Sequence, residues 1–273
     1  MSALIVVLAA VLGSVDASAG AAEGPIAIDP GTIVRWPGEE VESCGMGNRK
    51  WSALPDGCWY AIDLLTEPGP VRLVRRRRGI LEETAIRVTD YPYQVQRITL
   101  KDDSQVNLSA QDLARVRQEN QRIARLWSLD TSRAFALPLE APLDPLPDGG
   151  RFGQRRFFND QPRSPHSGAD YAAATGTPVG AVAAGRVALT GDFFFSGRSV
   201  FIDHGGGLVS MYFHLSEITV AEGDEVTPEE RIGAVGQSGR ATGPHLHFGI
   251  RWYGARVDPG LLIRTTQGVK SLP

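Results

Sequence analysis

The chain has 273 residues, of which 42% are hydrophobic and 22% charged, and its formal net charge is −3 at pH 7. This length accommodates two ordinary domains or one large one. The acidic balance excludes a generally basic surface, so no nucleic-acid partner is expected. With 31 glycines and 18 prolines, the composition disfavours a helical bundle and favours many short strands joined by turns.

Residues 1–19 have the features of a secretory signal peptide. An apolar run of about a dozen residues, too short to span a bilayer comfortably, is followed by the A-x-A site Ala17-Ser18-Ala19. No Lys or Arg precedes the run, so an uncleaved anchor or a misassigned start is the alternative. We expect an exported protein of the periplasm or cell envelope.

Export changes the interpretation of the two cysteines, Cys44 and Cys58. The turn-rich segment between them can bring the sulfurs together, and an oxidising compartment favours a disulfide over two free thiols. A loop of this size would stabilise the fold by roughly 3 kcal/mol. Without a C-x-x-C motif, metal binding by these cysteines is not expected.

Residues 25–105 are predicted to form a small β-sandwich. Short segments with alternating apolar positions are separated by turn residues, as is typical of that fold; they are residues 32–36, 59–64, 71–75, 85–88 and 94–100. A basic run, Arg75-Arg76-Arg77-Arg78, lies among them. It indicates a solvated hairpin tip, with a grip on an anionic polymer as the alternative.

A helix and a linker are expected next. Ser109 and Asp112 resemble a capping box, and apolar residues follow at helical spacing, which predicts one amphipathic helix over residues 109–128 that packs on a neighbouring domain. Residues 136–150 are rich in proline and glycine and predict an extended linker.

From residue 151 the pattern is again β. The expected strands are residues 177–182, 185–189, 199–203, 208–212, 231–235 and 245–251. Residues 176–179 and 223–226 echo each other, and each is followed within ten residues by another strand of small residues. The echo suggests a duplicated sheet motif.

All five histidines lie in this C-terminal half, at positions 166, 204, 214, 245 and 247. On a strand, His245 and His247 would project from the same face about 7 Å apart, which suits a metal site. His166 and Asp170 would lie about 13 Å apart on a straight strand, so the chain must curl back through Gly168 if both bind one ion.

A catalytic zinc site needs three protein ligands and one open position, and two histidines with one carboxylate are an established set. His166, Asp170, His214, His245 and His247 offer more donors than that, so two imidazoles would remain beside the open position. One could accept a proton from an attacking water, and a protonated one could stabilise an oxyanion. The group therefore fits amide hydrolysis. His204 is interpreted as a turn residue near the site, without a catalytic role.

Six segments carry a known pattern, in order and in spacing: residues 152–159, 165–170, 174–179, 203–205, 212–215 and 236–247. Over about residues 150–260 the chain resembles the lysostaphin-type (LytM-like) zinc metallopeptidases that cleave peptidoglycan peptides. The preceding region resembles, more weakly, the β-domain and helix of some periplasmic members. The fold class expected is therefore mainly β: an N-terminal β-sandwich, a linking helix and an antiparallel β catalytic domain of duplicated, barrel-sandwich type over residues 151–264.

The resemblance implies a role for each matching position. His166, Asp170 and His247 would hold Zn²⁺, His245 would be the general base, and His214 would assist. The implied activity is zinc-dependent endopeptidase cleavage of peptidoglycan cross-links, D-alanine to meso-diaminopimelate rather than pentaglycine, with stem peptides as partners.

Other interpretations stay open at this point. The alternative function is a zinc-bound but latent or regulatory peptidoglycan-binding protein that needs a partner protein for activity. Some members are latent because an upstream asparagine occupies the water position, and Asn159 is the candidate here. A general protease is a third interpretation. We expect a monomer.

Overall fold

The computed structural model describes residues 24–99, 107–129 and 131–273. The predicted signal peptide lies outside the described residues. Within these ranges, no helix is long and apolar enough to cross a membrane.

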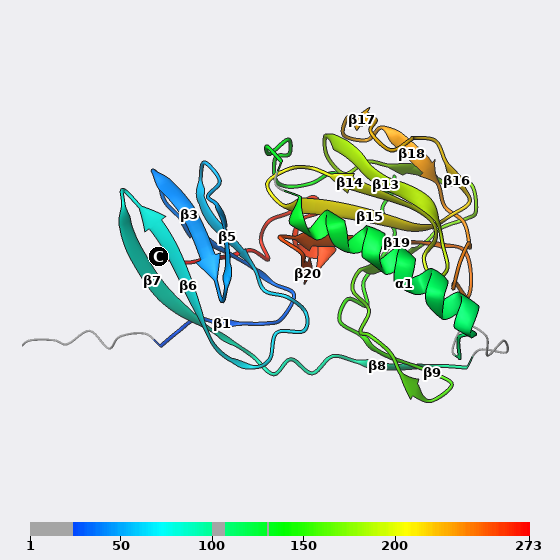
Figure 1. Ribbon diagram of the computed structural model, residues 1–273, viewed down its shortest axis with the longest axis horizontal. Helices are drawn as coiled ribbons and strands as arrows, with labels where there is room; N and C mark the ends of the chain where they lie inside the picture. Colours follow the sequence, from blue (N-terminus) through cyan, green and yellow to red (C-terminus); the bar gives the residue numbers. More distant parts are fainter. Residues whose placement is uncertain (1–23, 100–106, 130) are drawn as a thin grey trace, which may run out of the picture.

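The N-terminal part is two small sheets packed face to face (Figure 1). One sheet has the order β1-β7-β6-β3-β4, formed by Ala27–Ile28, Ile80–Val88, Gly69–Arg77, Val41–Met46 and Arg49–Ser52. The other has the order β21-β2-β5, formed by Lys270–Ser271, Ile33–Pro37 and Gly57–Ala61. Large side chains such as Tyr60, Leu73 and Ile86 fill the core between them.

A disulfide joins the two sheets. Cys44 of β3 and Cys58 of β5 are bonded, and their Cα atoms are 5.6 Å apart. The predicted pairing is confirmed. Because the bond links elements of different sheets, it fixes the packing of one sheet on the other.

The arginine run lies at the tip of the β6–β7 hairpin, where Arg78 and Gly79 form the turn. Glutamates neutralise much of its charge: Arg75 is paired with Glu82, and Arg78 with Glu40. The hairpin therefore offers less net charge to an anionic polymer than the sequence run suggests.

The C-terminal part is built on an antiparallel sheet with the order β11-β19-β15-β14-β13-β17, and β20 pairs with β19. Its strands are Ala169–Ala172, His245–Trp252, Leu208–Leu215, Gly197–Asp203, Gly185–Phe193, Glu225–Val226 and, for β20, Ala255–Val257. A smaller sheet, β12-β18-β16, is formed by Pro178–Gly180, Arg231–Ala234 and Glu217–Ile218. The mainly β prediction is confirmed.

The echo in the sequence has a counterpart in the pairing. Strand β12 begins within the first echo segment and β13 follows it, and β17 lies within the second echo segment and β18 follows it. Strand β12 pairs with β18, and β13 pairs with β17, so the two halves exchange strands. The duplicated motif itself stays a prediction.

The helix α1, Ala110–Ala124, lies across one face of the large sheet (Figure 1). Ser109 accepts a hydrogen bond from the Asp112 N–H, as the capping pattern predicted. The last predicted turn is a 3-10 helix, Arg125–Ser128, whose Leu126 is buried against β13–β15 side chains such as Phe201. The apolar stripe therefore packs on the C-terminal part.

The predicted linker is a packed segment. Residues 136–150 contain no extended strand, but Leu139 and Leu143 are buried in the large core, and the Leu139 N–H donates to the Leu262 carbonyl. Proline and glycine exclude regular structure here, yet the leucines still bury apolar area, so the segment is not a free spacer.

One predicted strand has a partner that differs from our expectation. Strand β8, Val95–Ile98, was assigned to the N-terminal sandwich, but it pairs in parallel with β9, Arg155–Phe158, which continues to β10, Gln161–Pro162. The apolar alternation of a strand predicts its faces and does not name its partner. The short sheet lies below the C-terminal part in Figure 1, near the N-terminal end of α1.

The N- and C-terminal parts are fastened to each other. Trp59 of β5 stacks on Trp252 of β19 with ring centres 5.2 Å apart, and the Arg256 guanidinium is 2.9 Å from the Asp63 carboxylate. The chain end also returns to the N-terminal part, where β21 pairs with β2. Strand β21 therefore belongs to the N-terminal sheets, although it follows the C-terminal part in the sequence.

Candidate metal centre

Two of the predicted ligands are cross-strand partners. Asp170 of β11 lies opposite His247 of β19, and His247 Nδ1 is 2.9 Å from Asp170 Oδ1. Directly opposed residues of an antiparallel pair lie close together on one face. The sheet register therefore places a carboxylate and an imidazole together without help from any loop.

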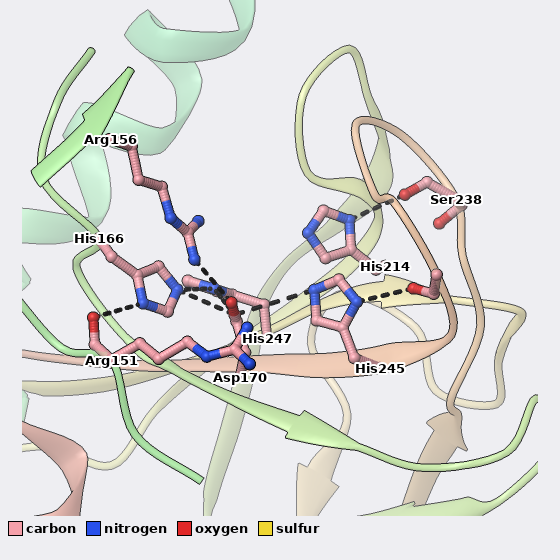
Figure 2. A network of polar contacts seen from close by, with 9 residues as sticks. Arg151, Arg156, His166, Asp170, His214, Ser238, His245 and His247 are labelled. Atoms are coloured by element: carbon pink, nitrogen blue, oxygen red, sulfur yellow. Dashed lines mark hydrogen bonds and ion pairs between the residues drawn. The ribbon is translucent and has the colours of Figure 1, made fainter. Parts of the chain in front are cut away.

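The third predicted ligand reaches the same point from outside the strand. His166 precedes β11, and its Nε2 is 2.9 Å from Asp170 Oδ1 and 2.9 Å from His247 Nδ1 (Figure 2). The ligand atoms of these three residues form a group that could hold a metal ion. The predicted curl of the chain is confirmed.

Gly168 allows this curl by its lack of a side chain. A Cβ at this position would lie 2.4 Å from the Phe248 carbonyl oxygen and 2.8 Å from His247 Nε2. The chain between His166 and Asp170 can approach β19 this closely only with glycine there.

The protonation pattern suits metal binding. His166 Nδ1 lies 2.9 Å from the Arg151 carbonyl, which can only accept, so Nδ1 carries the proton and Nε2 carries the lone pair. Burial lowers the pKa of His247 to about 4 and keeps this imidazole neutral. Neutral imidazoles and a carboxylate are ligands that zinc prefers, so the residues present fit the ion.

Asp170 is ionised despite its burial. Burial raises its pKa, but its contacts with the His166 and His247 imidazoles outweigh that effect and hold the pKa well below its usual range. Arg156 of β9 adds a guanidinium 2.7 Å from Asp170 Oδ2. One carboxylate oxygen thus faces the imidazoles and the other faces a cation.

Two further imidazoles lie beside this group, as predicted. His214 is the penultimate residue of β15 and His245 is the first residue of β19, and their ring centres are 4.8 Å apart. His214 Nδ1 is 2.8 Å from the Ser238 carbonyl, and His245 Nδ1 is 2.8 Å from the Gly243 carbonyl (Figure 2). In both rings Nδ1 is therefore the donor and Nε2 the acceptor.

His214 adopts an unusual backbone conformation, with φ at 64°. A non-glycine residue in this region costs free energy, and such residues cluster at functional sites. Burial, followed by the neighbouring His247 and His245, lowers the pKa of His214 to about 3. The neutral imidazole is thus the favoured form.

His204 precedes the turn at residues 205–207, as expected, but it is not among the residues that line the groove at the site. It is fully buried, with Nδ1 2.8 Å from the Ala184 carbonyl and Nε2 2.7 Å from Ser210 Oγ. Ser210 in turn lies 3.1 Å from the Tyr212 hydroxyl. The ring supports the core beneath the sheet, and the prediction of no catalytic role agrees with this placement.

A groove with two cavities, of about 420 Å³ and 610 Å³, lies over the group. Both cavities are lined by Arg156, Phe158, His214 and Arg240, so the β9 strand divides the groove. No functional role was predicted from the sequence for three of these residues, Arg156, Phe158 and Arg240. Strand β9 is the short segment Arg-Arg-Phe-Phe, and nothing in this segment signals that it crosses a metal site.

The structure places Asn159, the candidate blocking residue, directly after the last residue of β9. It follows β9 in the turn to β10, with φ at 47°, and its backbone N–H donates to the Ile98 carbonyl at 3.0 Å. It is absent from the lining of both groove cavities among the described residues. The residue of this segment that reaches Asp170 is Arg156.

The antiparallel sheet and its buried His–Asp–His group define a metallopeptidase-like β-domain, and comparison with known proteins names the family. The family model described as "Peptidase family M23" matches residues 164–259. A solved structure from Pseudomonas aeruginosa, assigned to peptidase M23, is 31% identical with a TM-score of 0.66, covering 87% of this chain and 94% of that one. The chain belongs to peptidase family M23.

Two curated relatives are similar over the C-terminal part. The peptidoglycan DD-endopeptidase ShyA of Vibrio cholerae is 44% identical over 95 residues, and the DD-carboxypeptidase/endopeptidase Mpg of Neisseria meningitidis is 47% identical over 94 residues. The matches cover 35% and 34% of this chain. The chain spans only 22% of the length of each of these relatives.

Proposed function

We propose that the chain is a zinc-dependent endopeptidase that hydrolyses peptide cross-links of peptidoglycan, at the bond from D-alanine to meso-diaminopimelate. The observation that carries the proposal is the His166–Asp170–His247 group with two more imidazoles presenting Nε2 beside it. The names of ShyA and Mpg support the substrate class.

His166 Nε2, Asp170 Oδ1 and His247 Nδ1 would hold the ion. When bound, zinc supplies Lewis-acid chemistry and lowers the pKa of a water to about 7. The Arg151 carbonyl accepts from His166 Nδ1 and so fixes the tautomer of this imidazole. The Arg156 guanidinium binds Asp170 Oδ2 and so orients the carboxylate. Such outer contacts hold ligands in position for binding.

His245 is assigned as the general base. Its Nδ1–H donates to the Gly243 carbonyl, so Nε2 has a lone pair that can accept a proton from water. The same nitrogen can then donate that proton to the leaving amine. The Nε2 atom also lies 3.8 Å from Asp170 Oδ1, close to the ligand group.

His214 is assigned as the second imidazole of the reaction. In its neutral form Nε2 is an acceptor, which can orient the attacking water together with His245. Stabilisation of an oxyanion would require the protonated form, which its lowered pKa disfavours. The water-orienting role is therefore the better supported of the two.

The proposal extends to organisation and location. Residues 25–105, 109–128, 136–150 and 151–264 are proposed as the N-terminal domain, helix, connecting segment and peptidase domain, with the pairing of β8 and β21 as exceptions to these bounds. The disulfide supports export to the periplasm or envelope, since such bonds persist in oxidising compartments.

One observation favours a latent form as the second candidate. Arg156 binds Asp170, and Phe158, from the same strand, lies in the groove between the two cavities. A long stem peptide could not occupy both cavities until β9 moved. In that case a partner protein would regulate the enzyme by displacing the strand.

Digestion of purified cross-linked peptidoglycan tests the proposal. Products are identified by mass spectrometry with and without a zinc chelator. We expect chelator-sensitive conversion of dimers to monomers by cleavage between D-alanine and diaminopimelate. Intact dimers from a protein shown to contain zinc would contradict constitutive activity and favour the latent form.

A further inference from the structure

The backbone of residues 151–158, called here the 151–158 segment, holds the proposed ligand His166 by three contacts. His166 Nδ1 donates to the Arg151 carbonyl at 2.9 Å. The His166 N–H donates to the Gln154 carbonyl at 2.9 Å, and the His166 carbonyl accepts from the Gly153 N–H at 2.7 Å. A shift of this segment would therefore shift the imbedded imidazole with it.

The second half of the segment is β9, which reaches another proposed ligand. The Arg156 guanidinium lies 2.7 Å from Asp170 Oδ2 (Figure 2). Strand β8 pairs with β9 in parallel, and just before this pairing the Arg155 N–H donates to the Gln94 carbonyl at 2.8 Å. Backbone hydrogen bonds from β8 thus hold the half of the segment that carries Arg156.

Tyr93, two residues before β8, packs on the first half of the segment. Gly153 lies so close to its ring that a Cβ there would be 1.9 Å from Tyr93 Cε1. The Tyr93 hydroxyl donates to the Pro30 carbonyl at 2.7 Å, and Pro30 lies between β1 and β2 of the N-terminal sheets. One side chain therefore connects the N-terminal part with the residue whose N–H binds the His166 carbonyl.

Phe152 makes a second connection to the N-terminal part. Gly31 lies against its ring, where a Cβ would be 2.3 Å from Phe152 Cε1. Gly31 is itself held by backbone hydrogen bonds, because its N–H donates to the Ile62 carbonyl and its carbonyl accepts from the Asp258 N–H, both at 2.9 Å. Phe152 directly follows the residue whose carbonyl sets the tautomer of His166.

We infer that Tyr93 and Phe152 are positioning residues for the metal site. Through them the N-terminal part holds the 151–158 segment where it orients His166 and Asp170. The inference rests on the metal site of the proposed function, and it makes the zinc affinity of the peptidase domain dependent on contacts with the N-terminal part. Loss of an outer contact to a metal ligand typically weakens metal binding by about 10- to 100-fold.

The test measures the zinc affinity of the full chain by competition with a chromophoric chelator. Tyr93→Ala and Phe152→Ala should each bind zinc about tenfold more weakly than the wild type, at the lower end of the range for outer contacts, because the effect reaches the ligands through the backbone. Tyr93→Phe keeps the ring on Gly153 and loses the hydroxyl bond to Pro30. Its affinity should lie between those of the wild type and Tyr93→Ala.

Amide hydrogen exchange of the zinc-free protein separates positioning from a general loss of stability. In Tyr93→Ala the amides of Gly153 and His166 should exchange faster, because the hydrogen bonds between the segment and His166 open more often. The amides between β15 and β19 should keep their wild-type protection. A variant that is only less stable overall would lose protection in the β15–β19 pair as well.

Asp63→Asn is the matched control. Asp63 also joins the two parts, since its carboxylate lies 2.9 Å from the Arg256 guanidinium, but this contact does not involve the 151–158 segment. The variant should bind zinc as the wild type does. Should Tyr93→Ala fail to fold, Phe152→Ala, which alters a half-buried side chain, and Tyr93→Phe still decide the question.

Wild-type zinc affinity in both alanine variants would overturn the inference and leave the proposed function intact. The same conclusion follows if Asp63→Asn weakens zinc binding as much as Tyr93→Ala, because any loosening of the two parts would then act on the site. A wild-type chain that binds no zinc would overturn the proposed function, and the inference with it.

Discussion

Asp170 and His247 face each other across the β11–β19 pair, with Oδ1 of one 2.9 Å from Nδ1 of the other. Because the sheet register sets this contact, two of the three proposed ligands are held in place before any ion binds. His166 then needs only the turn through Gly168 to complete the group.

Asp170→Ala should abolish metal binding. It removes one ligand and leaves Arg156 unpaired beside the site. We expect the wild type to bind one zinc per chain and to gain about 2.7 kcal/mol of stability at a hundredfold excess over Kd, and the variant to gain little. Metal content and thermal unfolding with added zinc measure this. Asp148→Ala, a carboxylate of the same groove outside the group, should bind zinc as the wild type does.

Gly168→Ala should weaken the metal site without removing a ligand. The new methyl group would displace His247 or the β19 backbone, because it would lie 2.8 Å from Nε2 of that ring. A loss of at least tenfold in zinc affinity is expected, measured by competition with a chromophoric chelator. Gly243→Ala meets nothing within 4 Å and serves as the control. Equal affinities for the two variants would show that the close approach is not needed.

His245→Ala should separate chemistry from metal binding. The variant removes the proposed base and keeps His166, Asp170 and His247, so zinc content should remain at the wild-type level. Loss of a general base typically lowers the rate by 10²- to 10⁴-fold. Hydrolysis of cross-linked muropeptides and metal analysis are measured on the same sample. A variant that loses zinc as well would place His245 among the ligands.

Breaking the Cys44–Cys58 bond should destabilise the N-terminal sheet pair. A closed loop of this length contributes about 3 kcal/mol in the chain-entropy model. Replacing both cysteines with serine should lower the denaturant midpoint by a corresponding amount. Reduction of the wild type is the parallel measurement, and it should have no effect on the double variant. Equal midpoints for variant and wild type would show that sheet packing alone holds the pair.

Stability should fall in acid partly because of His204. Burial lowers the pKa of this histidine to about 4 from an ordinary value of 6.5, so the unfolded chain binds more protons between these values. The free energy of unfolding therefore rises with pH in this window. The contribution is complete above about pH 6.5, is lost as the pH falls toward 4, and amounts to at most about 3 kcal/mol.

The contribution of His204 is measured by comparing the wild type with His204→Gln. The free energy of unfolding is determined as a function of pH for both proteins, and His214 and His247 are present in both. The slope between pH 4.5 and 6.5 should be smaller in the variant. An NMR titration of the wild type gives a second measurement, in which the His204 ring should stay neutral to about pH 5. A ring that titrates near 6.5 would contradict the prediction.

Local pattern was sufficient for much of this protein. Alternation of apolar residues predicted most strands, and the Ser109 cap with apolar residues at helical spacing predicted α1. The order and spacing of the histidine motifs indicated the five site residues, which the structure brings together. These features depend on backbone periodicity and side-chain chemistry, and both can be recognised in short segments of the sequence.

The tertiary structure alone decided which distant segments meet. The pairing of β8 with β9, the return of β21 to β2, and the arrival of Arg156 at Asp170 each join residues far apart in the chain. An edge strand can pair with any strand of matching register, and an arginine carries no signal of the carboxylate it will reach. The burial of His204 was not predicted for the same reason, since a Gly-rich neighbourhood indicates a turn, whereas burial depends on what packs over the residue.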